Sequence, residues 1–243
     1  MSAYVRKIIR DKREWHSQVT PEEEVLGFKG WHSRGYLPHF DSPGLRQFIT
    51  YRLADALPAS RRDEWQALLE IEDDFERIQK LEDYIDLGHG ECHLRDPQIA
   101  AVVQENLLHF DGKTYRLIAW CIMPNHVHAL IEMTETPLDE VLGSWKSYTS
   151  KRANRVLGRT GQFWQEEYFD RYMRDEEHLR QVIHYIENNP LNARLVRAPE
   201  QWRWGSARYR AEQSEGGLPR SAGGPPASPN EDTTSTKPTP PTP

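Results

Sequence analysis

Apolar residues recur at spacings of three and four in four stretches of the chain, which is the period of an amphipathic helix. Asp96 and Asp175 stand directly before two of these stretches, where an N-cap is expected. Pro190 predicts that the last helix ends by Asn189, because the residue before a proline disfavours the helical conformation. The predicted helices cover 61–87, 97–107, 137–157 and 176–189.

Runs rich in aromatic and β-branched residues predict the strands. Tyr115–Ile122 and His126–Met133 are separated by a three-residue turn and predict a hairpin. Gln47–Leu53 predicts an earlier strand and Trp202–Tyr209 a last one, while 163–173 is expected to be irregular or extended. Strands joined by hairpins, with helices between them, indicate an α+β domain with an antiparallel sheet.

Composition divides the chain into three parts. The tail at 211–243 is rich in Pro, Gly, Ser and Thr, holds little that could be buried, and is expected to be disordered. Residues 1–45 form a mixed N-terminal extension in which basic, acidic and aromatic stretches follow one another. We therefore expect one folded domain at 46–210.

Composition and charge exclude several classes of protein. No apolar run among the 243 residues approaches the length of a membrane span. Two cysteines cannot form a disulfide scaffold, which favours a reducing, cytoplasmic setting. The formal net charge is −6, yet 141–210 holds 13 Lys and Arg against 8 Asp and Glu. Because charges more than about 8 Å away are screened at physiological salt, this locally basic region can still meet a nucleic acid.

The sharpest chemical feature is His126-Val127-His128, inside the second strand of the predicted hairpin. Side chains alternate across a strand, so the two imidazoles share one face, while Val127, Ala129 and Ile131 form an apolar face. Two imidazoles on one strand face can converge on a single metal ion. The pair alone is weak evidence, because surface strands carry such pairs by chance.

On the last predicted helix, Tyr185 and Asn189 are neighbours at i and i+4 beside the apolar stripe. The helix can therefore pack by its apolar side and present a phenol and a carboxamide toward one point. Taken alone, this pattern favours a plainer interpretation: a half-buried packing tyrosine, followed by a helix stop before Pro190.

Five short motifs, taken together in their order and spacing, resemble those of a known family. They are MPNHVH at 123–128, WKSYT at 145–149, FWQEEYFDR at 163–171, RDEEH at 174–178 and YIENNP at 185–190. This set is similar to the REP-associated tyrosine transposases, which are single-tyrosine HUH transposases related to insertion-sequence-200-like elements. The resemblance covers about 47–209.

The resemblance implies a fold and a set of site residues. The expected fold is a ferredoxin-like antiparallel sheet with helices packed mainly on one face. His126 and His128 are expected to hold a divalent cation, Mg²⁺ or Mn²⁺, and the amide of Asn189 to complete its shell. Tyr185 stands at the position of the nucleophile. The chain departs from the family in size, and the resemblance assigns no role to the additions at the N-terminus, around 70–86 and in the tail.

The resemblance also implies an activity. A bound cation polarises the phosphoryl oxygens, and it helps a phenol with an ordinary pKa of about 10 to attack as a phenolate. The expected reaction is cleavage and rejoining of single-stranded DNA at palindromic or REP hairpins, through a covalent 5′-phosphotyrosine, in DNA transposition or repeat mobilisation. The alternative is a hairpin-binding protein with a structural or regulatory role and little cleavage. The resemblance leaves both a monomer and a homodimer open.

The basic segment after the hairpin is the expected DNA surface. Its cations would meet phosphates, and interleaved aromatic rings can stack on unpaired bases. For each cation, an ordinary solvated helix face is an equal alternative. The candidate residues are Lys146, Lys151, Arg152, Arg155, Arg159 and Trp164.

Two other chemistries remain open from the sequence. Glu132 shares the strand face of the histidines and could be the base of a metal hydrolase that uses water. His89, Cys92 and His93 offer three ligands to a structural zinc ion in a Gly-rich loop. A histidine-triad nucleotide hydrolase is excluded, because Leu130 stands where its third histidine is needed.

Overall fold

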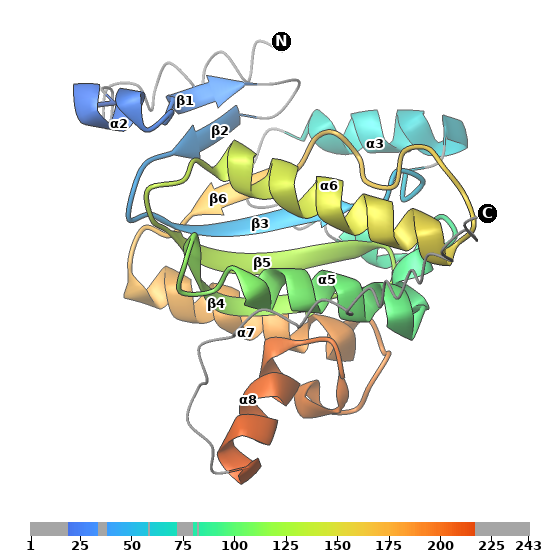
Figure 1. The fold of residues 1–243 in the computed structure, drawn as a ribbon. Coiled ribbons are helices and arrows are strands. Elements are labelled where there is room, and N and C mark those ends of the chain that lie inside the picture. Colours follow the sequence, from blue (N-terminus) through green and yellow to red (C-terminus); the bar gives the residue numbers. More distant parts are fainter. Residues whose placement is uncertain (1–18, 34–37, 58, 72–79, 82, 217–243) are drawn as a thin grey trace, which may run out of the picture.

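The computed structural model describes residues 19–33, 38–57, 59–71, 80–81 and 83–216 (Figure 1). An antiparallel sheet of four strands lies at its centre, in the order β4-β5-β3-β6. The predicted hairpin and the predicted first strand are confirmed, and the segment expected to be irregular or extended contains the last strand. The strands are β3 (Arg46–Arg52), β4 (Tyr115–Ile122), β5 (His126–Met133) and β6 (Phe169–Tyr172).

Three long helices cover the two faces of this sheet (Figure 1). α5 (Pro97–His109) and α6 (Leu138–Val156) pack on one face, and α7 (Glu176–Asn192) packs on the other. The chain order β3-α5-β4-β5-α6-β6, combined with the strand order, is the ferredoxin-like topology. The predicted fold class is therefore confirmed.

Alternation along β5 separates two hydrophobic layers, as the period of a strand requires. Val127 and Ala129 are fully buried in the core between the sheet and the helices α5 and α6. Leu130 faces the other way and packs against Leu179 and Ile186 of α7. The predicted apolar face of β5 is thus a core face, and the opposite face is covered by α7.

α7 continues through Pro190 to Asn192, so the predicted end of this helix at Asn189 is wrong. A proline removes one backbone donor from a helix. The following turn is nevertheless closed, because the Ala193 amide donates to the Asn189 carbonyl at 2.9 Å. Asn189 consequently stays helical, one turn after Tyr185.

The single helix predicted at 61–87 is also wrong. α3 (Arg62–Leu69) is a separate helix, and helical residues return at 80. Trp65 and Ile85 lie in one small buried cluster. In one straight helix these residues would be about 30 Å apart, so 61–87 cannot form one straight helix. The intervening residues 72–79 are outside the described ranges.

At the other end of the domain, the strand predicted at 202–209 is wrong. The segment makes one bridge, between Cys121 and Gly205, and a helix then begins at Ser206. The Trp202 indole donates to the Ile122 carbonyl at 3.0 Å and the Ile122 amide donates to the Trp204 carbonyl at 2.9 Å, so the segment pairs with β4 only at the end of that strand.

Shorter elements complete the described chain. A hairpin near the N-terminus packs beside β6, and a C-terminal helix packs beside β4. This helix continues past the predicted domain boundary at 210.

The predicted division of the chain into three parts otherwise stays a prediction, and 1–18 and 217–243 are outside the described residues. No helix in the described ranges is long and apolar enough to cross a bilayer. The shorter elements are α2 (Pro21–Val25), β1 (Gly30–Ser33), β2 (Pro38–Asp41), η1 (Ala59–Arg61), η2 (His93–Arg95), η3 (Pro199–Gln201) and α8 (Ser206–Gly216).

Candidate active site

The two histidines of β5 lie side by side on the face covered by α7. Each is 1% exposed, and their ring centres are 4.5 Å apart. Their Nε2 atoms point at one another, 2.9 Å apart. The structure therefore brings His126 and His128 to a single point, as expected from their shared strand face.

The other ring nitrogen of each histidine is held by the protein. Asn125 donates through Nδ2 to the Ile85 carbonyl at 3.0 Å, which leaves its Oδ1 to accept a hydrogen bond. That Oδ1 lies 2.8 Å from Nδ1 of His126. The hydroxyl of Thr50, which faces His128 across the β3–β5 pair, lies 2.8 Å from Nδ1 of His128. A proton on each Nδ1 leaves Nε2 with a lone pair in the neutral ring, the form that binds a metal.

α7 brings Tyr185 and Asn189 to the same point. The Asn189 carboxamide donates through Nδ2 to Tyr185 Oη at 3.1 Å, and the same nitrogen is 3.4 Å from Nε2 of His128. The Tyr185 ring stands edge-on to His128, with 5.5 Å between the ring centres. The predicted nucleophile, amide and histidine pair thus meet within one chain.

Asp86 is a further acidic group at this site, and sequence reasoning missed it. Its Oδ1 is 3.4 Å from Nε2 of His126, and its Oδ2 accepts from Nδ2 of Asn189 at 3.3 Å. Asp86 lies 40 positions before His126, in the acidic stretch to which the resemblance assigns no role. No spacing rule connects the two segments, so the sequence held no signal for this contact.

Burial controls the protonation of the cluster. Burial lowers the pKa of His128 to about 3 and that of His126 well below its ordinary value, in the second case helped by the charges of His128 and Arg52. Burial also raises the pKa of Asp86 to about 7, with Asp83 adding to the rise and the hydrogen bond from Asn189 opposing it. Neutral imidazoles are the metal-binding form of histidine.

Two buried oxygens in the cluster suit a cation. Oδ1 of Asp86 and Oδ1 of Asn189 have no hydrogen-bond partner among the described residues. Buried acceptors without a partner are costly, and a bound ion removes that cost by contacting them directly. Asp86, His126 and His128 form the one group in the described ranges whose ligand atoms all lie within 4.8 Å of one another. These residues therefore fit a divalent cation.

The competing chemistries are not supported by the structure. Glu132 is bound by Arg46 and Arg116 at the opposite end of β5, and the hydrogen bond from Arg116 is the main cause of its lowered pKa. Four residues of strand place it about 13 Å from His128. In the described part of the chain, the ligand atoms of His89, Cys92 and His93 are not brought together as a metal-binding group.

The predicted DNA residues differ in their surroundings. Lys146 donates to the carbonyls of Gln165 and Glu166 at 3.0 and 2.9 Å, so its ammonium group is already engaged. Trp164 is 3% exposed and its indole donates to Thr149, so the structure gives this ring a packing role instead of a base-stacking one. The predicted residues with exposed side chains are Lys151, Arg152, Arg155 and Arg159.

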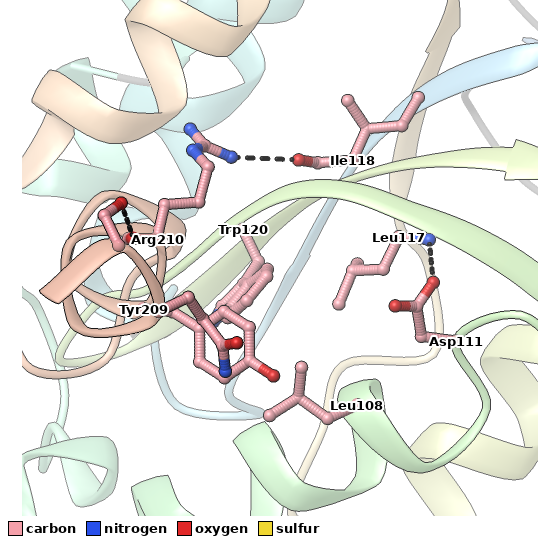
Figure 2. A pocket seen from close by; sticks show the side chains of 9 residues that line it. Leu108, Asp111, Leu117, Ile118, Trp120, Tyr209 and Arg210 are labelled. Atoms are coloured by element: carbon pink, nitrogen blue, oxygen red, sulfur yellow. Dashed lines mark hydrogen bonds between the residues drawn. The ribbon is translucent and has the colours of Figure 1, made fainter. Parts of the chain in front are cut away.

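A groove of about 370 Å³ lies beside the edge strand β4, between α5 and α8 (Figure 2). Trp120 and Tyr209 meet edge-on there, with 5.2 Å between the ring centres, and Arg210 donates to the Ile118 carbonyl at 3.3 Å. Trp120 belongs to the core on the α5–α6 face. This groove is therefore separated by the sheet from the histidine cluster.

Comparison with known proteins finds a family match and several structural likenesses, two of which follow. The model of a family described as transposase IS200-like matches residues 97–189. A structure of a REP-associated tyrosine transposase bound to a REP hairpin is 16% identical, covering 81% of this chain and 98% of that one, with a TM-score of 0.43. A protein assigned as a transposase from Deinococcus radiodurans R1 is 14% identical, covering 65% and 98%, with a TM-score of 0.28. No curated protein gives a significant match.

The family match covers the part of the chain that builds most of the site. It begins at α5, includes both strands of the hairpin, and ends at Asn189. The histidine pair, Tyr185 and Asn189 all lie inside it, whereas Asp86 lies before it. The segment at 97–189 is therefore similar to the IS200-like transposase family.

Proposed function

We propose that this protein is a metal-dependent transposase that cleaves and rejoins single-stranded DNA at palindromic or REP hairpins, with Tyr185 as its nucleophile. The observation that carries the proposal is the convergence of Tyr185, Asn189 and the two imidazoles at one point of one chain. The family match at 97–189 supports DNA as the substrate class.

In the proposed reaction, Oη of Tyr185 attacks the phosphorus atom of a phosphodiester. The new O–P bond replaces the bond from phosphorus to the 3′ oxygen. The phenol loses its proton, and the departing oxygen gains one to become a free 3′-OH. The hydrogen bond from Asn189 favours the phenolate, because a donor stabilises the charged form of its partner. The phosphotyrosine link conserves the ester bond, so attack by a 3′-OH rejoins the strand without ATP.

The proposed cation site consists of the Nε2 atoms of His126 and His128, with the carboxamide of Asn189 beside them. A Mg²⁺ or Mn²⁺ ion bound there would polarise the phosphoryl oxygens and offset the charge that develops on them. Asn125 and Thr50 orient the two rings, and the surrounding burial keeps both rings neutral.

The decisive experiment incubates the full chain with a labelled hairpin oligonucleotide and Mn²⁺, and looks for an adduct that survives denaturation. Tyr185→Phe is expected to abolish the adduct and leave hairpin binding within about twofold, because it removes one oxygen and keeps the ring in place. His128→Ala is expected to abolish the adduct as well, through loss of the cation.

An undiminished adduct in Tyr185→Phe would remove this residue from the nucleophile role. A wild-type protein that binds the hairpin tightly but forms no adduct at any Mn²⁺ or Mg²⁺ concentration would instead support the alternative. That alternative is a hairpin-binding protein with a structural or regulatory role.

A further inference from the structure

The segment between β3 and α5 supplies one acidic side chain to the histidine cluster. This segment lies before the part of the chain that matches the family model, and its small core is formed by Trp65, Leu81, Tyr84 and Ile85. Asp86 directly follows that core in sequence and has a side chain that is 20% exposed. Its placement at the cluster therefore depends on how this segment is attached to the sheet.

Two attachments hold the segment beside the histidines. Asn125 donates through Nδ2 to the carbonyls of Ile85 and His89, at 3.0 and 3.2 Å, and so binds the backbone on both sides of Asp86. The guanidinium of Arg52, the strand residue paired with His126, lies 4.6 Å from the ring centre of Trp65. The same Asn125 side chain orients His126 through Oδ1.

The atoms that meet at this point are acceptors. The proton on Nδ1 of His126 leaves its Nε2 with a lone pair, and Nε2 of His128 faces the amide nitrogen of Asn189. Oδ1 of Asp86 has no hydrogen-bond donor among the described residues. Three acceptors collected in a buried place repel one another unless a positive charge lies between them.

The spacing of these acceptors matches a coordination shell. Ligand atoms about 2.1 Å from an ion, and at right angles to one another, are about 3 Å apart. The two Nε2 atoms are 2.9 Å apart, and Oδ1 of Asp86 is 3.4 Å from the nearer one. Two imidazoles and one carboxylate arranged in this way leave positions open on the far side of an ion.

We infer that Asp86 is an anionic ligand of the cation held by His126 and His128, and that Asn125 is the positioning residue for this carboxylate. The inference rests on the cation site of the proposed function, and it adds a charged oxygen to a set of otherwise neutral donors. A carboxylate binds a divalent cation through charge as well as through its lone pair. The chain is therefore expected to bind its cation before DNA arrives.

The test is a titration of the full chain with Mn²⁺ in the absence of DNA, by calorimetry or by the Mn²⁺ paramagnetic resonance signal. Asp86→Asn keeps the shape of the side chain and removes its charge. It is expected to weaken Mn²⁺ binding by at least about tenfold, since the loss of an outer-shell partner alone costs 10- to 100-fold. Asp83→Asn is the matched control, because it removes the same charge from an exposed side chain in the same helical stretch. We expect it to change the affinity by less than about twofold.

The outcomes separate this inference from the proposed function. Wild-type affinity in Asp86→Asn, together with lost binding in His128→Ala, would overturn the role of Asp86 and leave the histidine site intact. If Asp83→Asn weakened Mn²⁺ binding as much as Asp86→Asn does, the ligand role of Asp86 would also be overturned. The loss of affinity would then come from the lower net negative charge of the region and not from a lost ligand. Cleavage supplies a second measurement: in Asp86→Asn the Mn²⁺ concentration for half-maximal rate should rise at least about tenfold, while the rate at saturating Mn²⁺ is retained. A lower saturated rate with an unchanged half-maximal concentration would contradict a ligand role.

Discussion

Each histidine of the site has one ring nitrogen bound to a neighbouring side chain and the other turned toward its partner. Thr50 reaches His128 from the adjacent strand, and Asn125 reaches His126 from the preceding turn. Such outer partners fix the tautomer and the direction of a ligand, so they affect metal binding without touching the ion. Phe48 stacks on His128 with 5.4 Å between the ring centres, which restricts the ring further.

Thr50→Val is expected to weaken Mn²⁺ binding by about tenfold, because it leaves Nδ1 of His128 without its partner in a buried place. The substitution preserves the shape of the side chain and suits a strand, so the fold is retained. Calorimetric titration of the purified protein measures the change.

Thr149→Val is the control for loss of a buried hydroxyl. Thr149 bonds to the Trp145 carbonyl and to the Trp164 indole on the other face of the sheet. The Thr149→Val variant is expected to have a free energy of unfolding about 1 kcal/mol lower than the wild type and an unchanged affinity for Mn²⁺. Equal Mn²⁺ affinity in Thr50→Val and the wild type would show that Thr50 has no part in the site.

At the scale of elements, a buried histidine links the β1–β2 hairpin to the edge strand β6, beside the packing of Trp31 and Phe40 on Tyr172. His39 of β2 contacts Asp170 of β6 through Nδ1, and its Nε2 lies 2.9 Å from Glu167. Burial opposes a charge on His39, yet the hydrogen bonds to the two carboxylates raise its pKa to about 9. Near neutral pH the hairpin is therefore held to the sheet by a buried cation between two acidic groups.

This attachment predicts a pH dependence of stability. The pKa of His39 in the folded protein lies above its ordinary value of 6.5. Its contribution to the free energy of unfolding is therefore fully present below about pH 6.5 and is lost as pH rises through 9. The shift corresponds to about 3 kcal/mol. Urea unfolding of the wild type should show this loss between pH 6.5 and 10, relative to His39→Gln measured at the same pH values. A constant difference between the two proteins would contradict the charged state of His39.

At the scale of the whole molecule, the two faces of the sheet carry different parts of the proposed function. The histidines lie under α7, which carries Tyr185, whereas exposed Lys151, Arg152 and Arg155 lie on the last turns of α6 on the opposite face (Figure 1). Because α6 runs back along the sheet after β5, these turns are at the end of the sheet where His126 lies. A DNA strand that contacts both would pass around this end of the sheet.

Salt dependence tests that path. Lys151 and Arg155 have exposed side chains, and each phosphate contact contributes about 0.7 to the slope of log affinity against log salt for single-stranded DNA. The double variant Lys151→Ala/Arg155→Ala is expected to lower the slope by about 1.4. Arg208→Ala, which removes a cation paired with Glu212 on α8, should leave it unchanged. Fluorescence anisotropy with a hairpin oligonucleotide between about 50 and 200 mM salt gives these values. Equal slopes for the double variant and the wild type would place the DNA elsewhere.

Local sequence patterns correctly predicted the helices and strands whose conformation depends on interactions between residues close together in the sequence. The hairpin of β4 and β5 and the Asp96 and Asp175 caps were all found where expected. The errors occurred where distant contacts decide the form. Trp65 of α3 shares a buried cluster with Ile85, which one straight helix would hold far from it. The segment after 202 pairs with β4 only at the end of that strand, where the Trp202 indole binds the Ile122 carbonyl.

For the site, the period of two along β5 placed both imidazoles on one face, and the spacing of four along α7 placed Tyr185 and Asn189 together. Both are consequences of backbone geometry within one element, so the sequence by itself determined them. Only the tertiary structure decided that the two elements meet, that Thr50 lies behind His128, and that Asp86 joins them. The reason is that the packing of buried surfaces sets the distance between residues in different elements. The number of residues between them in the sequence does not predict that distance.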